Sequence, residues 1–161
     1  MDAGGHGRSS TSAAVLLDTN VLIYAVDSSV PDKSARARSI LDSLESAGDG
    51  CLCAQVLGEY CSAVLRKFRH LIPSENVVAQ AEAWARAFPV RCTTTRVVLE
   101  ALRATIRYQM HYYDAQIWAV ARVNHIPLVL SEDFADGAVI EGVRFANPFA
   151  EGFDLEAVLA M

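Results

Sequence analysis

Five short apolar runs, separated by longer stretches of helical periodicity, limit what this 161-residue chain can fold into. They occupy residues 14–17, 51–53, 90–92, 127–130 and, more weakly, 143–145. Each is far shorter than the roughly 18 apolar residues that a membrane-spanning helix needs. Strands that alternate with helices are typical of a parallel sheet covered by helices. The pattern therefore predicts an α/β protein with a central parallel sheet of four to five strands flanked by helices.

The stretches between these runs carry apolar residues at spacings of three and four, as amphipathic helices do. The clearest stripe consists of Ala37, Ile40, Leu41 and Leu44. A later helix, which Thr95 can cap, has on one side Leu99, Leu102, Ile106 and Met110. Another helix starts near Asp114, so that its carboxylate heads the buried stripe of that helix.

A single domain is expected at residues 14–149, since no linker, repeat or low-complexity run divides the chain. Residues 1–13 are rich in Gly, Ser and Thr and predict a flexible leader, and residues 150–161 form a C-terminal tail. Nothing in the leader resembles a secretory signal, which makes the cytoplasm the expected compartment. The net charge of −5 argues against binding to nucleic acid through a broad basic surface.

The four cysteines stand at positions 51, 53, 61 and 92 and form no CxxC pair. A zinc site that combines Cys51, Cys53 and Cys61 with His70 is conceivable, but zinc ligands usually come in close pairs. Free cysteine is among the most buried residue types, and we favour a packing role for these side chains.

Four acids stand where a parallel sheet places functional sites, which is beyond the carboxyl ends of its strands. Asp18 directly follows the first expected strand, and Asp133 lies three residues after the fourth. Glu59 and Asp114 lie beside apolar helix stripes, where an acid is costly unless it is paired or neutralised by a cation. Together they are the oxygen ligands that Mg²⁺ or Mn²⁺ requires.

Each acid also has a simpler interpretation. Asp18 and Asp114 could be helix caps or first-turn acids, and Asp133 an ordinary loop acid. Glu59 could be a solvated helix residue, although Gly58 beside it costs about 1 kcal/mol relative to Ala and suggests close packing there. Separate roles do not explain why two acids stand at strand ends, and a shared site is the favoured interpretation.

Other α/β chemistries fail on spacing. Aspartyl-phosphate chemistry would need a second Asp where Asn20 stands, and a receiver domain would need a late Lys, whereas the only lysines are Lys33 and Lys67. The chain has no GxxxxGK[ST] loop and no GxSxG turn.

The ordered set of motifs resembles the PIN-domain nucleases, most closely the VapC-type toxins of bacterial toxin–antitoxin pairs. It comprises LLDTNVLIY at residues 16–24, Glu59, YYDA at 112–115, LSEDFADG at 130–137 and NPF at 147–149. The resemblance spans about residues 14–149. It implies a PIN-like fold, a carboxylate cluster that holds Mg²⁺ or Mn²⁺, endoribonuclease activity, homodimerisation and inhibition by a cognate VapB-like antitoxin.

By this resemblance, Asp18, Glu59 and Asp114 match the first three metal-binding and catalytic acids of the family. Asp133 matches the fourth acid, whose role is more variable and which Glu132 or Asp136 could share. The polar positions that orient the acids or the metal-bound water are matched by Asn20 and Ser131.

A hard cation on these carboxylates would activate water for hydrolysis of an RNA phosphodiester, leaving a 5′-phosphate and a 3′-hydroxyl. His111 is the one histidine near an expected ligand, and it more plausibly packs or contacts substrate. The densest basic run, expected to bind substrate, contains Arg66, Lys67 and Arg69; a second basic helix face contains Arg96, Arg103 and Arg107. The alternatives are a PIN-like binding module without activity and a metal-dependent phosphatase.

Overall fold

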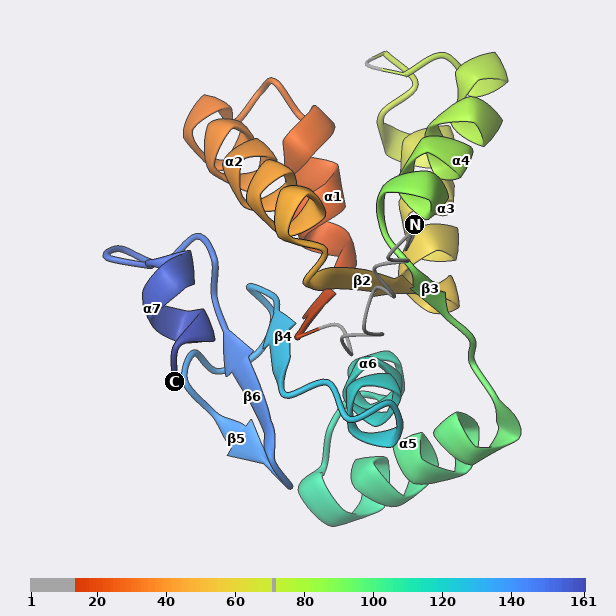
Figure 1. Cartoon of the computed structure of the whole chain (residues 1–161). Coiled ribbons are helices and arrows are strands. Elements are labelled where there is room, and N and C mark those ends of the chain that lie inside the picture. The colour runs from red at the N-terminus through yellow and green to blue at the C-terminus, as the bar shows by residue number, and fades with distance from the viewer. Residues whose placement is uncertain (1–13, 71) are drawn as a thin grey trace, which may run out of the picture.

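A six-stranded sheet lies at the centre of the computed structural model, which describes residues 14–70 and 72–161. The strand order is β3-β2-β1-β4-β6-β5, and each pair of neighbours is parallel except β5 and β6 (Figure 1). The strands are β1 Val15–Leu17, β2 Gly50–Cys53, β3 Val90–Arg91, β4 Leu128–Leu130, β5 Val139–Ile140 and β6 Val143–Ala146. Leu17 of β1 pairs with Leu130 of β4, so the carboxyl ends of these two central strands lie side by side.

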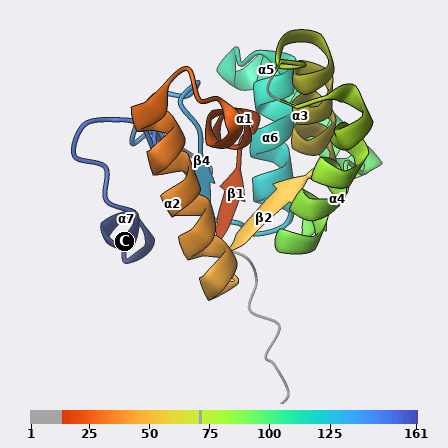
Figure 2. The ribbon, with the colours of Figure 1, turned by 90° about the horizontal axis from the view of Figure 1, so that it is seen from above.

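Helices lie on both sides of this sheet. Figure 1 shows α1 and α2 on one side, α5 and α6 on the other, and α3 with α4 at the end of the sheet formed by β2 and β3. In Figure 2, α2 partly overlies β4 and leaves β1 and β2 in view. The helices are α1 Thr19–Val26, α2 Pro31–Ala47, α3 Ala54–Lys67, α4 Val77–Ala87, α5 Thr95–Tyr108, α6 Tyr112–Val123 and α7 Leu155–Leu159, with a 3-10 turn at Ser74–Asn76.

The helices cover both faces of the sheet, and this explains the sequence of the central strands. Every residue of β1, β2 and β4 is buried, which is why these strands appear as continuous apolar runs rather than alternating ones. The expected α/β fold is confirmed. Its sheet has six strands, not four to five, because the two-residue strand β5 joins β6 through a hairpin.

Three elements are absent from the expectations above: α1, β5 and α7. The residues of α1 after Asn20 are uniformly apolar, so they have no polar period by which a helix is recognised. Strand β5 is too short to form a pattern, and α7 falls within the expected C-terminal tail. The expected leader lies outside the described residues.

The outward face of α5 is strongly apolar. The side of this helix that packs on α6 consists of small residues, namely Val97, Ala101 and Ala104. Its large apolar residues, Leu99, Leu102 and Ile106, are exposed, and Ile106 is 82% exposed. The cap is Thr94, one residue before the expected Thr95, and its hydroxyl accepts a hydrogen bond from the Val97 amide at 3.3 Å. Small side chains allow α5 and α6 to approach closely, which leaves the larger ones facing outward.

Among the described helices, none combines the length and the apolar character that a membrane crossing requires.

Candidate active site

Asp18 directly follows β1 and caps α1, and it is only 4% exposed. Its Oδ1 accepts a hydrogen bond from the Thr19 amide at 2.6 Å, and its Oδ2 accepts one from the Ser131 hydroxyl at 2.6 Å. Burial raises the pKa of Asp18 to about 6 in spite of these two bonds, and the charges of Asp133 and Glu59 raise it further. Asp18 is the N-cap of α1, as the capping interpretation expected, and its carboxyl also lies near the acids Asp133 and Glu59.

Asn20 links the ends of β1 and β4. Its Nδ2 lies 3.1 Å from Asp133 Oδ2, 3.2 Å from Ser131 Oγ and 3.4 Å from Asp18 Oδ2. The Ser131 hydroxyl also accepts a hydrogen bond from the Asp133 amide at 3.1 Å. Because β1 and β4 are neighbours in the sheet, residues 111 or more positions apart form one network.

Glu59 reaches this network from α3. The Thr19 hydroxyl donates to its Oε2 at 3.0 Å, and Gln55 Nε2 donates to its Oε1 at 2.8 Å. Gln55 Nε2 also lies 3.1 Å from the carbonyl oxygen of Tyr113, so it ties α3 to the first turn of α6. Thr19 and Gln55 were not expected from the sequence; Gln55 stands one helical turn before Glu59, which is the signal that could have marked it.

Asp114 lies in that first turn of α6 and is half-buried. Burial raises the pKa of its carboxyl, the nearby His111 lowers it, and the charges of Asp133 and Glu59 raise it. Asp133 and Glu59 are therefore the charged neighbours that Asp18 and Asp114 share.

No group of three or more His, Cys, Asp or Glu side chains within residues 14–70 and 72–161 is arranged to hold a metal ion as the side chains stand. Several carboxylate oxygens instead accept hydrogen bonds from Asn20, Thr19 and Ser131. The donor set still fits a divalent cation, because Asn20 Oδ1 is buried beside these acids without a hydrogen-bond partner in the described chain. Oxygen donors of this kind suit Mg²⁺ or Mn²⁺.

The two alternative fourth acids are engaged elsewhere. Glu132 accepts hydrogen bonds from the Tyr24 hydroxyl and from Lys33 Nζ, each at 2.5 Å. Asp136 accepts one from the Asn147 amide at 2.8 Å and so closes the loop that follows β4. Asp133 is the acid of this segment that contacts Asn20.

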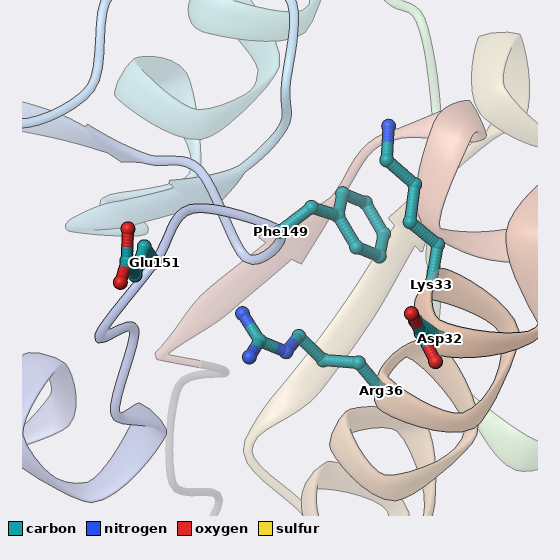
Figure 3. Close-up of a pocket in the computed structure, with 5 residues that line it drawn as sticks. All are labelled: Asp32, Lys33, Arg36, Phe149 and Glu151. Atoms are coloured by element: carbon teal, nitrogen blue, oxygen red, sulfur yellow. The ribbon is translucent and has the colours of Figure 1, made fainter.

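A cavity of about 230 Å³ lies next to the Lys33–Glu132 pair, between α2 and the segment after β6 (Figure 3). Arg36 in its wall donates to the carbonyl oxygen of Ala150 at 2.7 Å, and Lys33 lies over the rings of Tyr24 and Phe149. Both cations therefore hold the segment 147–150 against α2, and none of the four clustered acids lines this cavity.

The basic run at the end of α3 is divided by the structure. Arg66 lines a second cavity that also contains Glu59, whereas the exposed Lys67 and Arg69 do not line it. The second basic face is largely paired, since Arg103 contacts Glu100 at 2.5 Å and Arg107 contacts Glu141 at 3.0 Å.

Gly58 does not serve close packing, contrary to expectation. A Cβ at this position would meet no heavy atom within 4 Å, because this side of α3 faces the second cavity rather than a neighbouring element. Cys51 and Cys53 are buried in β2, and burial raises the pKa of each thiol to about 11, as expected for packing residues.

The fold and this cluster define an α/β protein with a carboxylate site at the ends of adjacent parallel strands. The chain belongs to the PIN domain family, whose model matches residues 15–135. The resemblance to that family is confirmed. The curated proteins with which the sequence was compared contain no match.

Solved structures share the fold. The DNA-bound VapBC complex from Salmonella typhimurium is 19% identical with a TM-score of 0.62, over 83% of this chain and 97% of that chain. FitAcB from Neisseria gonorrhoeae is 20% identical with a TM-score of 0.61, over 84% and 98%. VapC20 from Mycobacterium tuberculosis, described as a Sarcin-Ricin loop cleaving toxin, is 17% identical with a TM-score of 0.56, over 71% and 86%.

Proposed function

We propose that this chain is a metal-dependent endoribonuclease and the toxin of a VapBC-type toxin–antitoxin pair. The observation that carries the proposal is the hydrogen-bond network at the carboxyl ends of β1 and β4, in which Asn20 contacts both Asp18 and Asp133. Thr19, next to Asp18, extends it to Glu59 of α3, and Asp114 stands in the first turn of α6. Membership of the PIN domain family supports a nuclease, and the names of the similar structures include toxin–antitoxin complexes and an RNA-cleaving toxin.

The four acids would hold Mg²⁺ or Mn²⁺, which when bound lowers the pKa of water and offsets negative charge on the phosphate. The protein positions these ligands. Asn20 and Ser131 fix the carboxylates of Asp18 and Asp133 relative to each other. Such outer contacts matter because they orient the groups that bind the metal.

Gln55 and Thr19 hold Glu59 on α3, and Asp114 stands in the first turn of α6. His111 is exposed at the N-cap position of α6 and makes no hydrogen bond with Asp114 in the described chain. We therefore expect hydrolysis that leaves a 5′-phosphate and a 3′-hydroxyl rather than attack by the 2′-hydroxyl.

The decisive experiment is an RNA cleavage assay of the purified protein with Mn²⁺ or Mg²⁺. We expect Asp18→Asn or Asp114→Asn to reduce the rate by about 10³-fold or more, because each removes a charged ligand. Asp42→Asn, at an exposed position of α2, is the matched control and should keep the wild-type rate. Cleavage that is unaffected by EDTA would overturn the proposal. RNA binding without any cleavage would favour a non-catalytic module, and turnover of a nucleotide monophosphate alone would favour a phosphatase.

Two protein partners belong to this proposal. A VapB-like antitoxin would inhibit the site, and a second copy of the chain would cover the apolar face of α5 formed by Leu99, Leu102 and Ile106. Exposed apolar surfaces of this kind mark protein contacts. We place the dimer with its RNA substrate in the cytoplasm.

A further inference from the structure

A cavity of about 590 Å³ extends from the acidic cluster along α3. Thr19 and Glu59 lie in the part that adjoins the cluster, and Arg66 lies seven residues further along the helix. Seven residues of helix cover about 10 Å. Ligand clefts commonly have volumes of roughly 300–1,000 Å³, so the cavity has room for part of a substrate beside the acids.

The α3 side of the cavity is bare around Gly58. Glycine in a helix interior destabilises the helix, and the usual compensation is close contact with another element. Here a Cβ would meet nothing within 4 Å, so no contact within the described chain requires the glycine. What the glycine provides is space at the floor of the cavity, on the stretch of α3 between Gln55 and Arg66.

The α6 side of the cavity is formed by Tyr113, whose side chain is 54% exposed. Its backbone carbonyl is held by Gln55, the residue that also holds Glu59, so the position of Tyr113 is fixed relative to the acidic cluster. Its ring contacts those of His111 and Tyr112 and is still exposed. An exposed aromatic ring beside the proposed nuclease site is suited to stacking on an unpaired base.

Arg66 supplies positive charge at the far part of the cavity. It is exposed, and within the described chain no carboxylate lies within ion-pair distance of its guanidinium. Its Nε donates to the Ser62 carbonyl oxygen at 3.3 Å, which directs the side chain back along α3. A guanidinium placed in this way can contact a phosphate.

We propose that this cavity binds the single-stranded RNA that flanks the cleaved bond, with one base stacked on Tyr113, the backbone passing over Gly58 and a phosphate on Arg66. The proposal rests on the proposed nuclease function and names where its substrate lies. The exposed ring of Tyr113 and the guanidinium of Arg66, which forms no ion pair within the described chain, lie on either side of a bare helix surface. This arrangement matches the alternation of bases and phosphates in a single strand.

The test measures binding of a fluorophore-labelled single-stranded RNA of mixed sequence to the full chain in EDTA, by fluorescence anisotropy, and cleavage of the same RNA with Mn²⁺. Gly58→Leu fills the floor, and Tyr113→Ala removes the ring. We expect each to weaken binding about tenfold and to raise KM more than it lowers kcat. Tyr113→Phe keeps the ring and should bind as the wild type does.

Ala83→Leu, at an exposed mid-helix position of α4 away from the cavity, is the control for Gly58→Leu and should leave binding unchanged. Leu is a better helix former than Gly, so Gly58→Leu should melt at the same temperature as the wild type or higher, which separates a blocked cavity from a misfolded chain.

Equal RNA binding by wild type, Gly58→Leu and Tyr113→Ala would overturn the proposed cavity while leaving the nuclease function intact. If the wild type neither binds nor cleaves RNA, both proposals fail. If Gly58→Leu and Tyr113→Ala bind RNA as the wild type does but are no longer inhibited by the antitoxin, the RNA assignment is overturned. The cavity would then be a binding site for a peptide of the antitoxin.

Discussion

Asp18 shows how one residue can have a structural and a chemical role. It caps α1 through the Thr19 amide and lies, almost fully buried, among other acids. The N-terminus of a helix favours a negative charge, but burial and the charges of Asp133 and Glu59 oppose it. In the absence of metal the carboxyl therefore keeps its proton to higher pH than a solvated aspartate does.

This conflict predicts that the metal-free protein loses stability as the pH rises. The pKa of Asp18 is about 6 in the folded chain and about 3.9 in the unfolded chain, so the folded state binds the proton more tightly. As the pH rises from about 3 to about 7, the free energy of unfolding should fall by about 3 kcal/mol through this group, with about 2 kcal/mol of the fall between pH 4 and pH 6. Urea unfolding in EDTA measures this change.

Asp18→Asn, which cannot ionise, should remove most of that slope and should be the more stable chain at pH 7 without metal. Addition of Mn²⁺ at pH 7 should raise the melting temperature of the wild type and have less effect on the variant. Identical pH slopes for the two chains would contradict the prediction.

At the scale of elements, the β5–β6 hairpin is fastened to α5 and α6 through one side chain. Glu141, at the turn with a φ of 46°, accepts hydrogen bonds from the Tyr108 hydroxyl and from Arg122, and forms an ion pair with Arg107. The Trp118 indole donates to the Ile140 carbonyl oxygen at 3.1 Å. These contacts hold β5 against β6, and β6 leads directly into the segment 147–150.

Glu141→Gln should therefore destabilise the fold. The hydrogen bond from Tyr108, followed by that from Arg122, lowers the pKa of Glu141, so its contribution is present above about pH 4 and is lost as the pH falls through the lowered pKa. The carboxylate is partly exposed, and we expect a loss of about 1 kcal/mol at pH 7. A melting temperature lower by roughly 2–4 °C would show it. Glu82→Gln, whose partner Arg86 is 3.7 Å away on an open surface, should change nothing measurable.

At the scale of the whole molecule, α5 carries apolar residues on two faces. The small face packs on α6, and the large face, formed by Leu99, Leu102 and Ile106, has no covering element in the described chain. A monomer that exposes such a face would be less soluble, whereas a symmetric contact between two copies would bury the face.

We expect the wild type to be a dimer at micromolar concentration and Ile106→Asp or Leu102→Asp to be monomeric, because a charge would be buried in the contact. Light scattering after size-exclusion chromatography measures the mass. Val78→Asp, at an exposed apolar position of α4, is the matched control and should stay dimeric. A wild type that elutes as a monomer would rule out this face as the contact.

The α/β architecture was predictable from the sequence, because buried strands and amphipathic helices differ in apolar periodicity. The sequence also pointed to the candidate acids, since carboxylates at strand ends or beside apolar helix stripes are costly without a partner. It could not mark α1 or β5, because the first has no polar period and the second has two residues.

The contacts that those residues make became visible only in the folded chain. Pairing of β1 with β4 brings Asn20 to Asp133, and Gln55 joins α3 to α6, contacts that no sequence spacing encodes. The folded chain also reversed the expectation for Gly58, which borders an open cavity instead of a packed neighbour. Periodicity reports which residues avoid water, whereas the partner of each side chain depends on how distant segments pack.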